Sequence, residues 1–421
     1  MRIEIVTIGD ELLLGFTIDT NAAHLARELA ALGVQVVRRA TVGDRAEEIA
    51  AAVRDALNRT GAVIMTGGLG PTADDLTKPA IAALFGRSLA LDPAIVAHLE
   101  RIWKERGRPG ALPATNLQQA MIPEGARVLF NRHGTAPGIW LEDGGGRWAA
   151  MLPGVPREMR GMLADELLPL VAARAGAGAG VVRSRTLRTT GIAESQLAVS
   201  LGDLAQRAEG LPLAYLPGVD GVDLRLTARG LGADEAERTL AAGAARLRER
   251  LGRFGYGEDD TDLAAVVLDA CRARGLRAAV AESCTGGVLA ARFTAVAGSS
   301  DVVEGGVIAY DNRVKRELLG VDDRDLEAYG AVSEPVARQM AAGVRARLGT
   351  AVGVGITGVA GPGGGTPEKP VGTVWIAASV EDAAWAARML FIGDREEIRR
   401  RAAQAALDML RRMLLFPAER G

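Results

Sequence analysis

Histidine and cysteine are scarce in this chain of 421 residues. Its three histidines, His24, His98 and His133, all lie in the first third of the chain, and its two cysteines are Cys271 and Cys284. Two cysteines are too few for a disulfide framework or a cysteine-rich zinc site. A Ser-His-Asp triad or a Cys-His pair in the last two thirds would need a histidine from the N-terminal part or from another subunit.

The chain also lacks a strong net charge and a long apolar run. Its formal net charge is −2, with 48% hydrophobic and 24% charged residues, which is the composition of a soluble globular protein. Without a basic excess, we expect no nucleic acid partner. No apolar stretch of about 18 residues is free of charge, and Met1 leads directly into a strand-like segment. We therefore expect no membrane association and no signal peptide, and a cytoplasmic location.

The length and the order of patterns predict three domains. Residues 1–175 and residues 256–421 both alternate strand and helix patterns, which predicts an α/β fold with a largely parallel sheet in each. Between them, residues 176–255 have the pattern of a small α+β domain. The segments AGAGAG at 175–180 and GYGEDDTD at 255–262 are typical of a linker and a boundary.

The stretch AESCTGGVLAARF places three nucleophile-capable side chains, Ser283, Cys284 and Thr285, in the turn between an apolar strand and a helix, directly ahead of Gly286 and Gly287. One explanation is structural, because Ser and Thr are good helix N-caps and glycine allows a tight turn. The other is chemical: the turn presents a hydroxyl or thiol at the sheet edge, and the free N–H groups of the helix start suit an oxyanion.

Four further segments with polar residues or glycines fall at predicted strand ends or helix starts. Each alone has a structural explanation; Ser333, for example, is expected to be an N-cap without a chemical role. Together they indicate a site, because such loops meet beyond the carboxyl ends of the strands in an open α/β sheet. The segments are Tyr310-Asp311-Asn312 with Lys315, Ser333-Glu334-Pro335, Thr357 to Gly365, and Gly393-Asp394-Arg395 with Arg399 and Arg400.

The lack of histidine indicates which base a serine at position 283 would use. A lysine with a lowered pKa is an alternative base for a serine nucleophile, and Lys315 is the candidate. Tyr310 could orient or relay protons, and an arginine could bind a carboxylate or phosphate.

Five segments in this part of the chain closely resemble the nicotinamide mononucleotide (NMN) deamidase domain of the competence/damage-inducible protein A family. They are AESCTGG, AYDNRVK, GAVSEPVARQMA, GITGVAGPGGGTPEKPVGTVW and GDREEIRRRA, and the resemblance covers about residues 260–415. It implies hydrolysis of the NMN carboxamide to nicotinate mononucleotide and ammonia, with no cofactor. It also implies that Ser283 is the nucleophile and that Lys315 and Tyr310 complete the catalytic group. Because a thiolate usually needs a histidine or another cation to form, we expect Cys284 to be a packed thiol. The residues expected to bind NMN are Thr285, Gly286, Gly287, Asn312, Thr357, Gly358, Ala360, Gly361 and Arg399.

One position departs from this family pattern. Asp311 stands where the family often has serine in Tyr-Ser-Asn. If its carboxylate points toward Lys315, it would raise the pKa of that lysine and oppose its role as a base.

The N-terminal part carries a second dense segment, TGGLGPTADDLTK at 66–78. Its glycines allow a ligand to approach the backbone, and we expect Asp74 and Asp75 to open a helix whose first N–H groups favour an anion. Asp10 and Glu11 follow the first strand in a similar position. Thr72 and the two aspartates could also simply cap the helix. Four carboxylates beside a phosphate cradle would instead fit a divalent cation that bridges substrate phosphates.

GDELLLG, TNAAHLA, VGD, TGGLGPTADDLTK, GTAPGIW and LPGVPREM resemble the N-terminal domain of the same family, which is similar to the molybdopterin-binding fold. The resemblance implies an ADP-ribose pyrophosphatase that uses a divalent cation (Mg, Mn or Co). The alternative is a protein that binds a pterin or nucleotide without N-terminal catalysis and serves as an adaptor in competence or DNA repair. The residues expected to bind the substrate are Gly67, Gly68, Gly70, Pro71 and Thr72, and those expected to bind the metal are Asp10, Glu11, Asp74 and Asp75.

The middle part resembles the family's connecting module, which is similar to a KH-type fold. It contains a GxxG sequence, Gly218-Val219-Asp220-Gly221. A GxxG loop that binds nucleic acid lies between helices and has basic residues inside it, whereas this one lies between strand patterns and contains an aspartate. We therefore expect a spacer or a dimer contact here. The whole chain is expected to be a homodimer that acts on NMN and ADP-ribose in pyridine nucleotide salvage.

Overall fold

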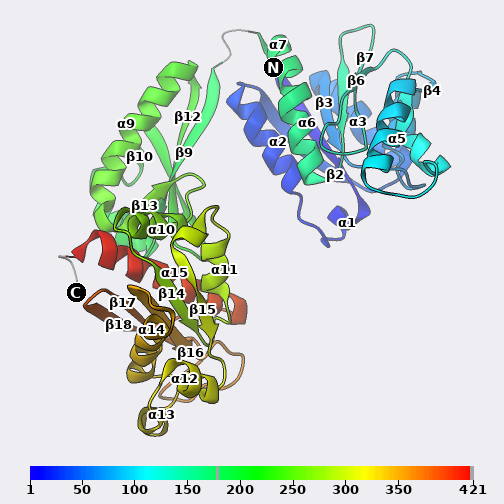
Figure 1. The fold of residues 1–421 in the computed structure, drawn as a ribbon. Helices are drawn as coiled ribbons and strands as arrows, with labels where there is room; N and C mark the ends of the chain where they lie inside the picture. The colour runs from blue at the N-terminus through cyan, green and yellow to red at the C-terminus, as the bar shows by residue number, and fades with distance from the viewer. Residues whose placement is uncertain (177–179, 418–421) are drawn as a thin grey trace. The chain divides into compact units, whose positions relative to one another are not determined.

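The computed structural model describes residues 1–176 and 180–417 (Figure 1). The chain divides into two compact units, Met1–Arg183 with Ala228–Glu237 and Ser184–Thr227 with Arg238–Gly421. Half of the predicted linker AGAGAG, residues 177–179, lies outside the described residues. No helix of the described chain is both long and apolar enough to cross a membrane.

The N-terminal part is built on a six-stranded sheet of order β2-β1-β3-β8-β7-β6. The first four strands are parallel, and β7 runs antiparallel to both β8 and β6. A separate two-stranded sheet pairs β4 (Leu89–Leu91) with β5 (Met121–Pro123). The strands of the large sheet are β1 (Arg2–Ile8), β2 (Gln35–Val42), β3 (Ala62–Thr66), β6 (Arg127–Leu129), β7 (Gly138–Glu142) and β8 (Trp148–Leu152).

Both faces of this sheet are covered by helices. Successive strand residues point to opposite faces, so Ile64 enters one core cluster and Met65 the other. Residues of α2, α6 and α7 pack in the first cluster, and residues of α3 and α4 in the second. This arrangement confirms the predicted α/β class. The helices are α1 (Asp10–Leu13), α2 (Thr20–Ala31), α3 (Ala46–Thr60), α4 (Thr77–Leu84), α5 (Pro93–Glu105), η1 (Ala114–Ala120), α6 (Pro156–Met162), η2 (Leu163–Leu167) and α7 (Leu168–Ala175).

One helix starts later than the sequence suggests. Asp74 and Asp75 do not open α4, which begins at Thr77. The carboxylate of Asp75 accepts hydrogen bonds from the backbone N–H of Gly70 (2.7 Å) and of Thr72 (2.8 Å). Such local bonds from an aspartate compete with helix formation, and they hold residues 70–75 as a loop.

The middle part has a five-stranded sheet of order β10-β11-β12-β9-β13. The GxxG sequence lies in the turn between β11 and β12, as predicted. The segment 255–262 begins with strand β13, which pairs antiparallel with β9. The elements are β9 (Val181–Thr189), α8 (Glu194–Leu201), η3 (Gly202–Leu204), β10 (Arg207–Ala208), β11 (Leu211–Pro217), β12 (Val222–Leu231), α9 (Ala233–Leu251), η4 (Gly252–Phe254) and β13 (Gly255–Glu258).

The C-terminal part has a five-stranded sheet of order β15-β14-β16-β17-β18. Strand β14 is parallel to both its neighbours, while β17 is antiparallel to β16 and to β18. The strands are β14 (Ala278–Glu282), β15 (Val303–Ile308), β16 (Val352–Gly358), β17 (Thr373–Val380) and β18 (Ala383–Leu390).

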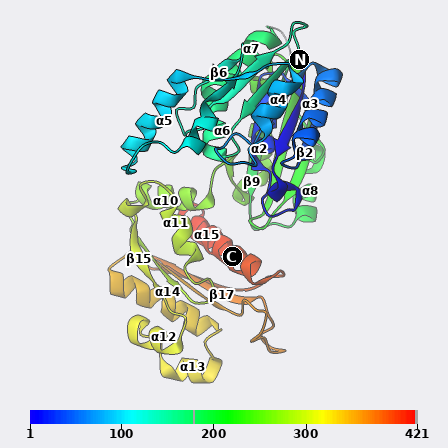
Figure 2. The same ribbon diagram turned by 90° about the vertical axis from the view of Figure 1, so that its right-hand side faces the viewer.

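Helices cover this sheet on both faces. Figure 2 shows α15 and α14 on opposite sides of it, and the buried residues of these helices belong to separate core clusters. The parallel strands β14 and β16 end side by side, which brings together the loops that follow them. The helices are α10 (Leu263–Ala273), α11 (Val288–Thr294), η5 (Ser299–Asp301), α12 (Asn312–Leu319), α13 (Asp323–Tyr329), α14 (Glu334–Leu348) and α15 (Arg395–Leu415).

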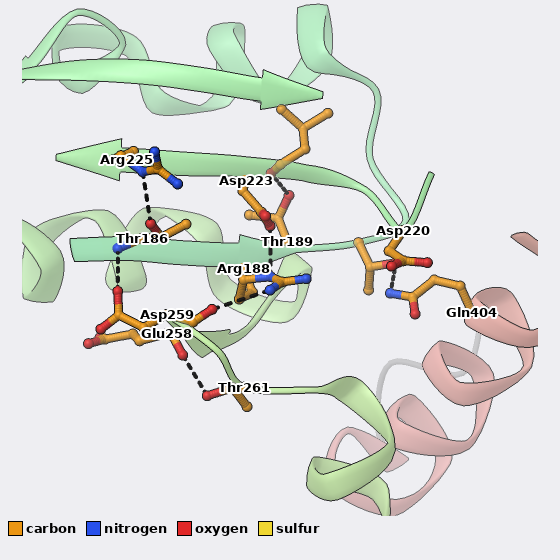
Figure 3. Close-up of polar contacts among 12 residues, drawn as sticks. Thr186, Arg188, Thr189, Asp220, Asp223, Arg225, Glu258, Asp259, Thr261 and Gln404 are labelled. Carbon is orange, nitrogen blue, oxygen red and sulfur yellow. Dashed lines mark hydrogen bonds and ion pairs between the residues drawn. The ribbon is translucent and has the colours of Figure 1, made fainter. Parts of the chain in front are cut away.

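The long helix α15 also contacts the middle part through polar side chains. Gln404 points from α15 toward the strands of that part (Figure 3) and donates from Nε2 to Thr190 Oγ1 at 3.2 Å. Arg411 is 1% exposed, and its guanidinium bonds Asp408 (2.6 Å), the carbonyl of Gly255 (3.0 Å) and the carbonyl of Arg253. These bonds hold the end of α15 to the segment that leads into β13.

Replacing Arg411 with alanine should lower the free energy of unfolding by about 3 kcal/mol, because the change strips a buried carboxylate and two carbonyls of a charged donor. Denaturant unfolding would measure the loss. Arg347→Ala is the matched control, because Arg347 is exposed on α14, and its effect should stay within about 0.5 kcal/mol. Equal losses in the two variants would contradict this account.

Candidate active sites

Ser283 and Lys315 meet at the carboxyl edge of the C-terminal sheet. Ser283 follows β14 directly, and its backbone N–H is held by the carbonyl of Ile356 on β16 at 2.9 Å. Lys315 lies on α12 with its side chain 1% exposed. The Nζ atom of Lys315 is 3.2 Å from Ser283 Oγ, so a predicted nucleophile and its predicted base lie within hydrogen-bond distance.

Two carbonyls fix the direction of the Lys315 amine. Its Nζ donates to the carbonyl oxygens of Ala309 (2.8 Å) and Tyr310 (3.1 Å). A neutral amine has two N–H donors and one lone pair, so with both donors engaged the lone pair is left to accept the proton of Ser283. Burial disfavours the charged form and lowers the pKa of Lys315 from its usual value.

The carboxylate of Asp311 opposes this effect without overturning it. Its side chain caps α12 and accepts from the N–H of Arg313 at 2.7 Å. It raises the pKa of Lys315 through its charge, as expected from the sequence, but desolvation by burial is the larger effect and the pKa remains lowered.

The start of α11 is not available to an oxyanion, contrary to the sequence-based expectation. The carboxylate of Glu282 accepts hydrogen bonds from the N–H groups of Gly287 (3.0 Å), Leu289 (3.2 Å) and Ala290 (2.8 Å). Glu282 is 1% exposed, and its charge complements the helix dipole. The strand residue before Ser283 therefore already occupies the helix N-terminus, and the predicted oxyanion site there is wrong.

Cys284 also lines the pocket but is a poor nucleophile. Burial raises the pKa of its thiol to about 12. The reactive form of cysteine is the thiolate, so the thiol is inert at neutral pH. Ser283 is thus the side chain of this turn that has a base beside it.

Tyr310 and Arg395 form the outer part of the pocket. The Tyr310 hydroxyl accepts from Arg395 Nη2 at 3.0 Å, and Arg395 Nη1 donates to the carbonyl of Gly361 at 2.5 Å. The sequence placed Arg395 in a segment at the site, but Arg399 was the arginine predicted to bind NMN. The signal was the capping box in GDREE, since the paired bonds of Asp394 and Glu397 fix the start of α15 and hence the place of Arg395.

The pocket around Ser283 has a volume of about 280 Å³. The three predicted catalytic residues line it, and so do five of the predicted NMN-binding residues, Asn312, Thr357, Gly358, Ala360 and Gly361. Four others lie outside the lining, namely Thr285, Gly286, Gly287 and Arg399. The structure shows why for two of them: Thr285 is fully buried, and the Arg399 guanidinium is bonded to the Thr285 carbonyl at 2.9 Å.

The N-terminal pocket has a volume of about 430 Å³ and lies beyond the carboxyl ends of β1 and β3. Gly67 and Gly68, with φ of +113° and +65°, form its glycine-rich wall. A Cβ atom on Gly67 would lie 2.2 Å from the carbonyl oxygen of Ile8, and one on Gly68 would lie 2.2 Å from Thr77 Oγ1. Only glycine fits at these two positions. Gly70 and Pro71 also line the pocket, while Thr72 does not.

Carboxylates gather at one side of this pocket. Glu11, Asp74 and Asp75 line it as predicted, together with Asp44, which sequence reasoning missed. Burial, and then the charges of nearby Asp10, Glu11 and Asp74, raise the pKa of Asp44. The segment VGD at the end of β2 was the available signal for this residue.

The predicted metal residues do not form a ready-made cage. Asp10 does not line the pocket; it pairs with Arg45 at 3.7 Å. Asp75 is engaged with Gly70 and Thr72. Within residues 1–176 and 180–417, no three His, Cys, Asp or Glu side chains are grouped so that they could hold a metal ion alone. The remaining carboxylates are still suitable donors for a hard cation that is partly held by substrate phosphates.

A buried lysine lies next to this pocket. Lys78, on α4, donates from Nζ to the carbonyls of Gln118 (2.5 Å) and Gln119 (3.1 Å), and Gln119 lines the pocket. Burial lowers the pKa of Lys78 to about 8. Its position in TGGLGPTADDLTK was visible in the sequence, but its burial was not.

Two α/β parts with a pocket at the strand ends of each, and a small α+β part between them, define a multidomain protein with two separate candidate active sites. Family models match all three parts. "Probable molybdopterin binding domain" matches residues 4–173, "Damage-inducible protein CinA KH domain" matches residues 184–257, and "CinA C-terminal domain" matches residues 260–414. The chain belongs to the CinA family of competence/damage-inducible proteins.

Similar proteins span the whole chain. A CinA-like protein of Gemmatimonas aurantiaca is 66% identical over 412 residues, which are 98% of this chain and 96% of that protein. A CinA-like protein of Salinibacter ruber is 45% identical over 98% of this chain and all of its own length. Among solved structures, the competence/damage inducible protein CihA of Agrobacterium tumefaciens is 42% identical, covers 35% of this chain and 91% of its own, and has a TM-score of 0.35.

Replacing Asp311 with asparagine should lower the pKa of Lys315 further, because the change removes a nearby negative charge while asparagine keeps the helix cap. The chain has only four lysines, so NMR titration of protein labelled with ¹³C-lysine would resolve them, with Lys315→Met giving the assignment. Asp322→Asn is the matched control, since Asp322 caps α13 in the same way by accepting from the N–H of Arg324. An unchanged or raised pKa in Asp311→Asn would refute the assignment of charges around Lys315.

Proposed function

We propose that the Ser283 pocket hydrolyses the carboxamide of NMN to nicotinate mononucleotide and ammonia. The observation that carries this proposal is the 3.2 Å contact between Ser283 Oγ and a buried Lys315 amine whose other donors are engaged by two carbonyls. A serine with a lysine base can attack an amide without histidine or metal. The family resemblance is the basis for NMN as the substrate, and the Ser283–Lys315 contact is the basis for the proposed amide hydrolysis.

The proposed reaction has two halves. In the first, Ser283 Oγ attacks the carboxamide carbon while Lys315 Nζ takes the hydroxyl proton, and Lys315 returns that proton to the leaving nitrogen, which departs as ammonia. The product is an ester of Ser283. In the second half, water attacks the ester with Lys315 again as base, which frees the carboxylate product and restores the serine hydroxyl.

Arg395 is the residue that we propose to bind the NMN phosphate. Arg395 lines this pocket, whereas the predicted Arg399 does not. A guanidinium forms strong paired hydrogen bonds with phosphate. Tyr310, which is bonded to Arg395, would position that guanidinium and close one side of the substrate.

We further propose that the N-terminal pocket cleaves the pyrophosphate of ADP-ribose with the help of a divalent cation such as Mg, Mn or Co. Glu11, Asp44 and Asp74 would hold the cation together with the substrate phosphates. When bound, such an ion neutralises phosphate charge and activates the attacking water. The glycine wall at residues 67–70 would let the backbone approach the phosphates.

The two activities would serve pyridine nucleotide salvage in the cytoplasm, and the rest of the proposal is a homodimer that acts on soluble nucleotides and not on nucleic acid. The GxxG turn between β11 and β12 favours this, because it carries Asp220 in place of a basic residue. The rival is an adaptor that binds a pterin or nucleotide without N-terminal catalysis; an N-terminal pocket that binds ADP-ribose without cleaving it would favour that rival.

Ser283→Ala and Lys315→Met should each reduce NMN turnover at least about a thousandfold, the scale that follows loss of a nucleophile or its base. Release of ammonia from NMN would measure it. Cys284→Ala is the matched control, since a thiol with a pKa of about 12 is protonated at the assay pH, and it should keep most of the activity. A dead Cys284→Ala beside an active Ser283→Ala would refute the mechanism.

Chelation of divalent cations should abolish cleavage of ADP-ribose and leave NMN deamidation intact, because only the first is proposed to need an ion. Asp44→Asn should lower AMP release from ADP-ribose at least about tenfold. Asp55→Asn is the matched control, since Asp55 lies on the surface of α3 with a side chain 66% exposed. Loss of both activities on chelation would contradict the proposed separation of the two sites.

A further inference from the structure

A third cavity, of about 610 Å³, lies between α15, β18 and two turns of the middle part. It is separate from the Ser283 pocket, with which it shares no lining residue. Its volume falls within the range of about 300–1,000 Å³ that is usual for small-molecule sites. Nothing in the proposed deamidase or pyrophosphatase reaction uses it.

The guanidinium of Arg401 is the feature of this cavity that indicates a ligand-binding site. Within the described part of the chain, Arg401 makes no hydrogen bond or ion pair, and its Nε atom is buried without a partner. Nearby arginines of α15 are all paired: Arg400 with Asp220, and both Arg411 and Arg412 with Asp408. A cation that lines a cavity with an unsatisfied buried N–H is costly unless an anion binds it.

The acidic residues of the cavity are largely neutralised. Asp408 is shared by Arg411 (2.6 Å) and Arg412 (2.8 Å), and Asp220 pairs with Arg400 at 3.5 Å. Of the charged lining residues, Arg401 and Glu194 are left without an ion pair in the described chain. Glu194 is an exposed residue at the start of α8, so its charge is screened by solvent.

The opposite wall is apolar and aromatic. Trp385 and Met389 share one face of the edge strand β18, and Phe391 continues the same alternation just beyond the strand. All three are partly buried. An indole and a phenyl ring at one side of a cavity offer a stacking surface for a planar group.

The third wall is a pair of turns from the middle part. Residues Thr190–Glu194 and the GxxG turn Gly218–Gly221 line it. Gln404 holds the first turn to α15 through Thr190 Oγ1, and its own Oε1 accepts from Arg292 Nη1 at 2.6 Å. The cavity is therefore framed by fixed contacts, and the GxxG turn faces a small-molecule space on its own chain.

We propose that this cavity binds a small organic anion that carries a planar aromatic ring, with its carboxylate or phosphate on Arg401 and its ring against Trp385 and Phe391. The site is distinct from both proposed active sites and does not depend on either activity. Carboxylate and phosphate share the chemistry that Arg401 recognises, so the test includes one probe of each kind.

The test is isothermal titration of the full chain with 1-naphthoate and with AMP, compared with inorganic phosphate and with neutral adenosine. We expect one or both aromatic anions to bind wild type, and Arg401→Met to weaken that binding at least about tenfold. Trp385→Ala should weaken it by a similar factor. The probe that binds more tightly shows whether the site prefers a carboxylate or a phosphate. AMP binding that survives both substitutions would be assigned to the N-terminal pocket and would not support the proposal.

Arg324→Met is the matched control, because Arg324 lies on α13 with a side chain 91% exposed, and it should bind like wild type. Thermal melting checks that each variant is folded; if Arg401→Met is not, Arg401→Lys against Arg401→Gln tests the charge and Trp385→Ala tests the ring. The proposal is overturned if neither aromatic anion shows binding that depends on Arg401 and Trp385, or if inorganic phosphate binds as tightly as AMP.

Discussion

The C-terminal site depends on the burial of one lysine amine. Lys315 is 1% exposed and its Nζ is surrounded by Ser283 Oγ and two backbone carbonyls. A charged ammonium loses hydration there, which lowers its pKa. The two carbonyls that accept hydrogen bonds from Lys315 also orient its neutral amine, so that the lone pair points toward the hydroxyl of Ser283. Because burial alone lowers the pKa of this amine, the proposed reaction needs no histidine as base.

Carboxylates at strand ends have different roles in the two α/β parts. Glu282 ends β14, and its carboxylate accepts hydrogen bonds from three backbone N–H groups at the N-terminus of α11. In the N-terminal part, the carboxylate of Asp75 likewise accepts hydrogen bonds from backbone N–H groups of the loop at residues 70–72. Asp44 accepts a hydrogen bond from one backbone N–H, that of Asp10 at 2.9 Å, and burial raises its pKa among other carboxylates. An acidic residue in a motif is therefore a better candidate ligand when fewer of the nearby backbone N–H groups bind its carboxylate.

Much of the architecture could be predicted from the sequence. The alternation of apolar runs and helical patterns predicted the α/β class. Strands and helices have different hydrophobic periods, and each segment is long enough for its period to be recognised. Ser283, Lys315 and Tyr310 were expected to lie together, since motifs at strand ends meet at one sheet edge, and they line one pocket. The predicted start of α4 was too early, because hydrogen bonds to the Asp75 side chain hold the preceding residues as a loop. Whether an aspartate side chain forms such bonds depends on the local backbone conformation, which the sequence pattern does not show.

Which elements form and which loops share a sheet edge follow from the amino-acid pattern alone, because hydrophobic period and turn residues are local properties. Which polar side chains are already hydrogen-bonded or paired, and which are available to a ligand, depends on the tertiary packing. Arg395 and Arg399 lie four positions apart on α15 and each bonds a carbonyl, yet Arg395 lines the pocket and Arg399 does not. Arg400 is exposed and pairs with Asp220, whereas the adjacent Arg401 is partly buried and has no acidic partner within the described chain. Burial and pairing arise from distant segments packed together, so no local pattern encodes them.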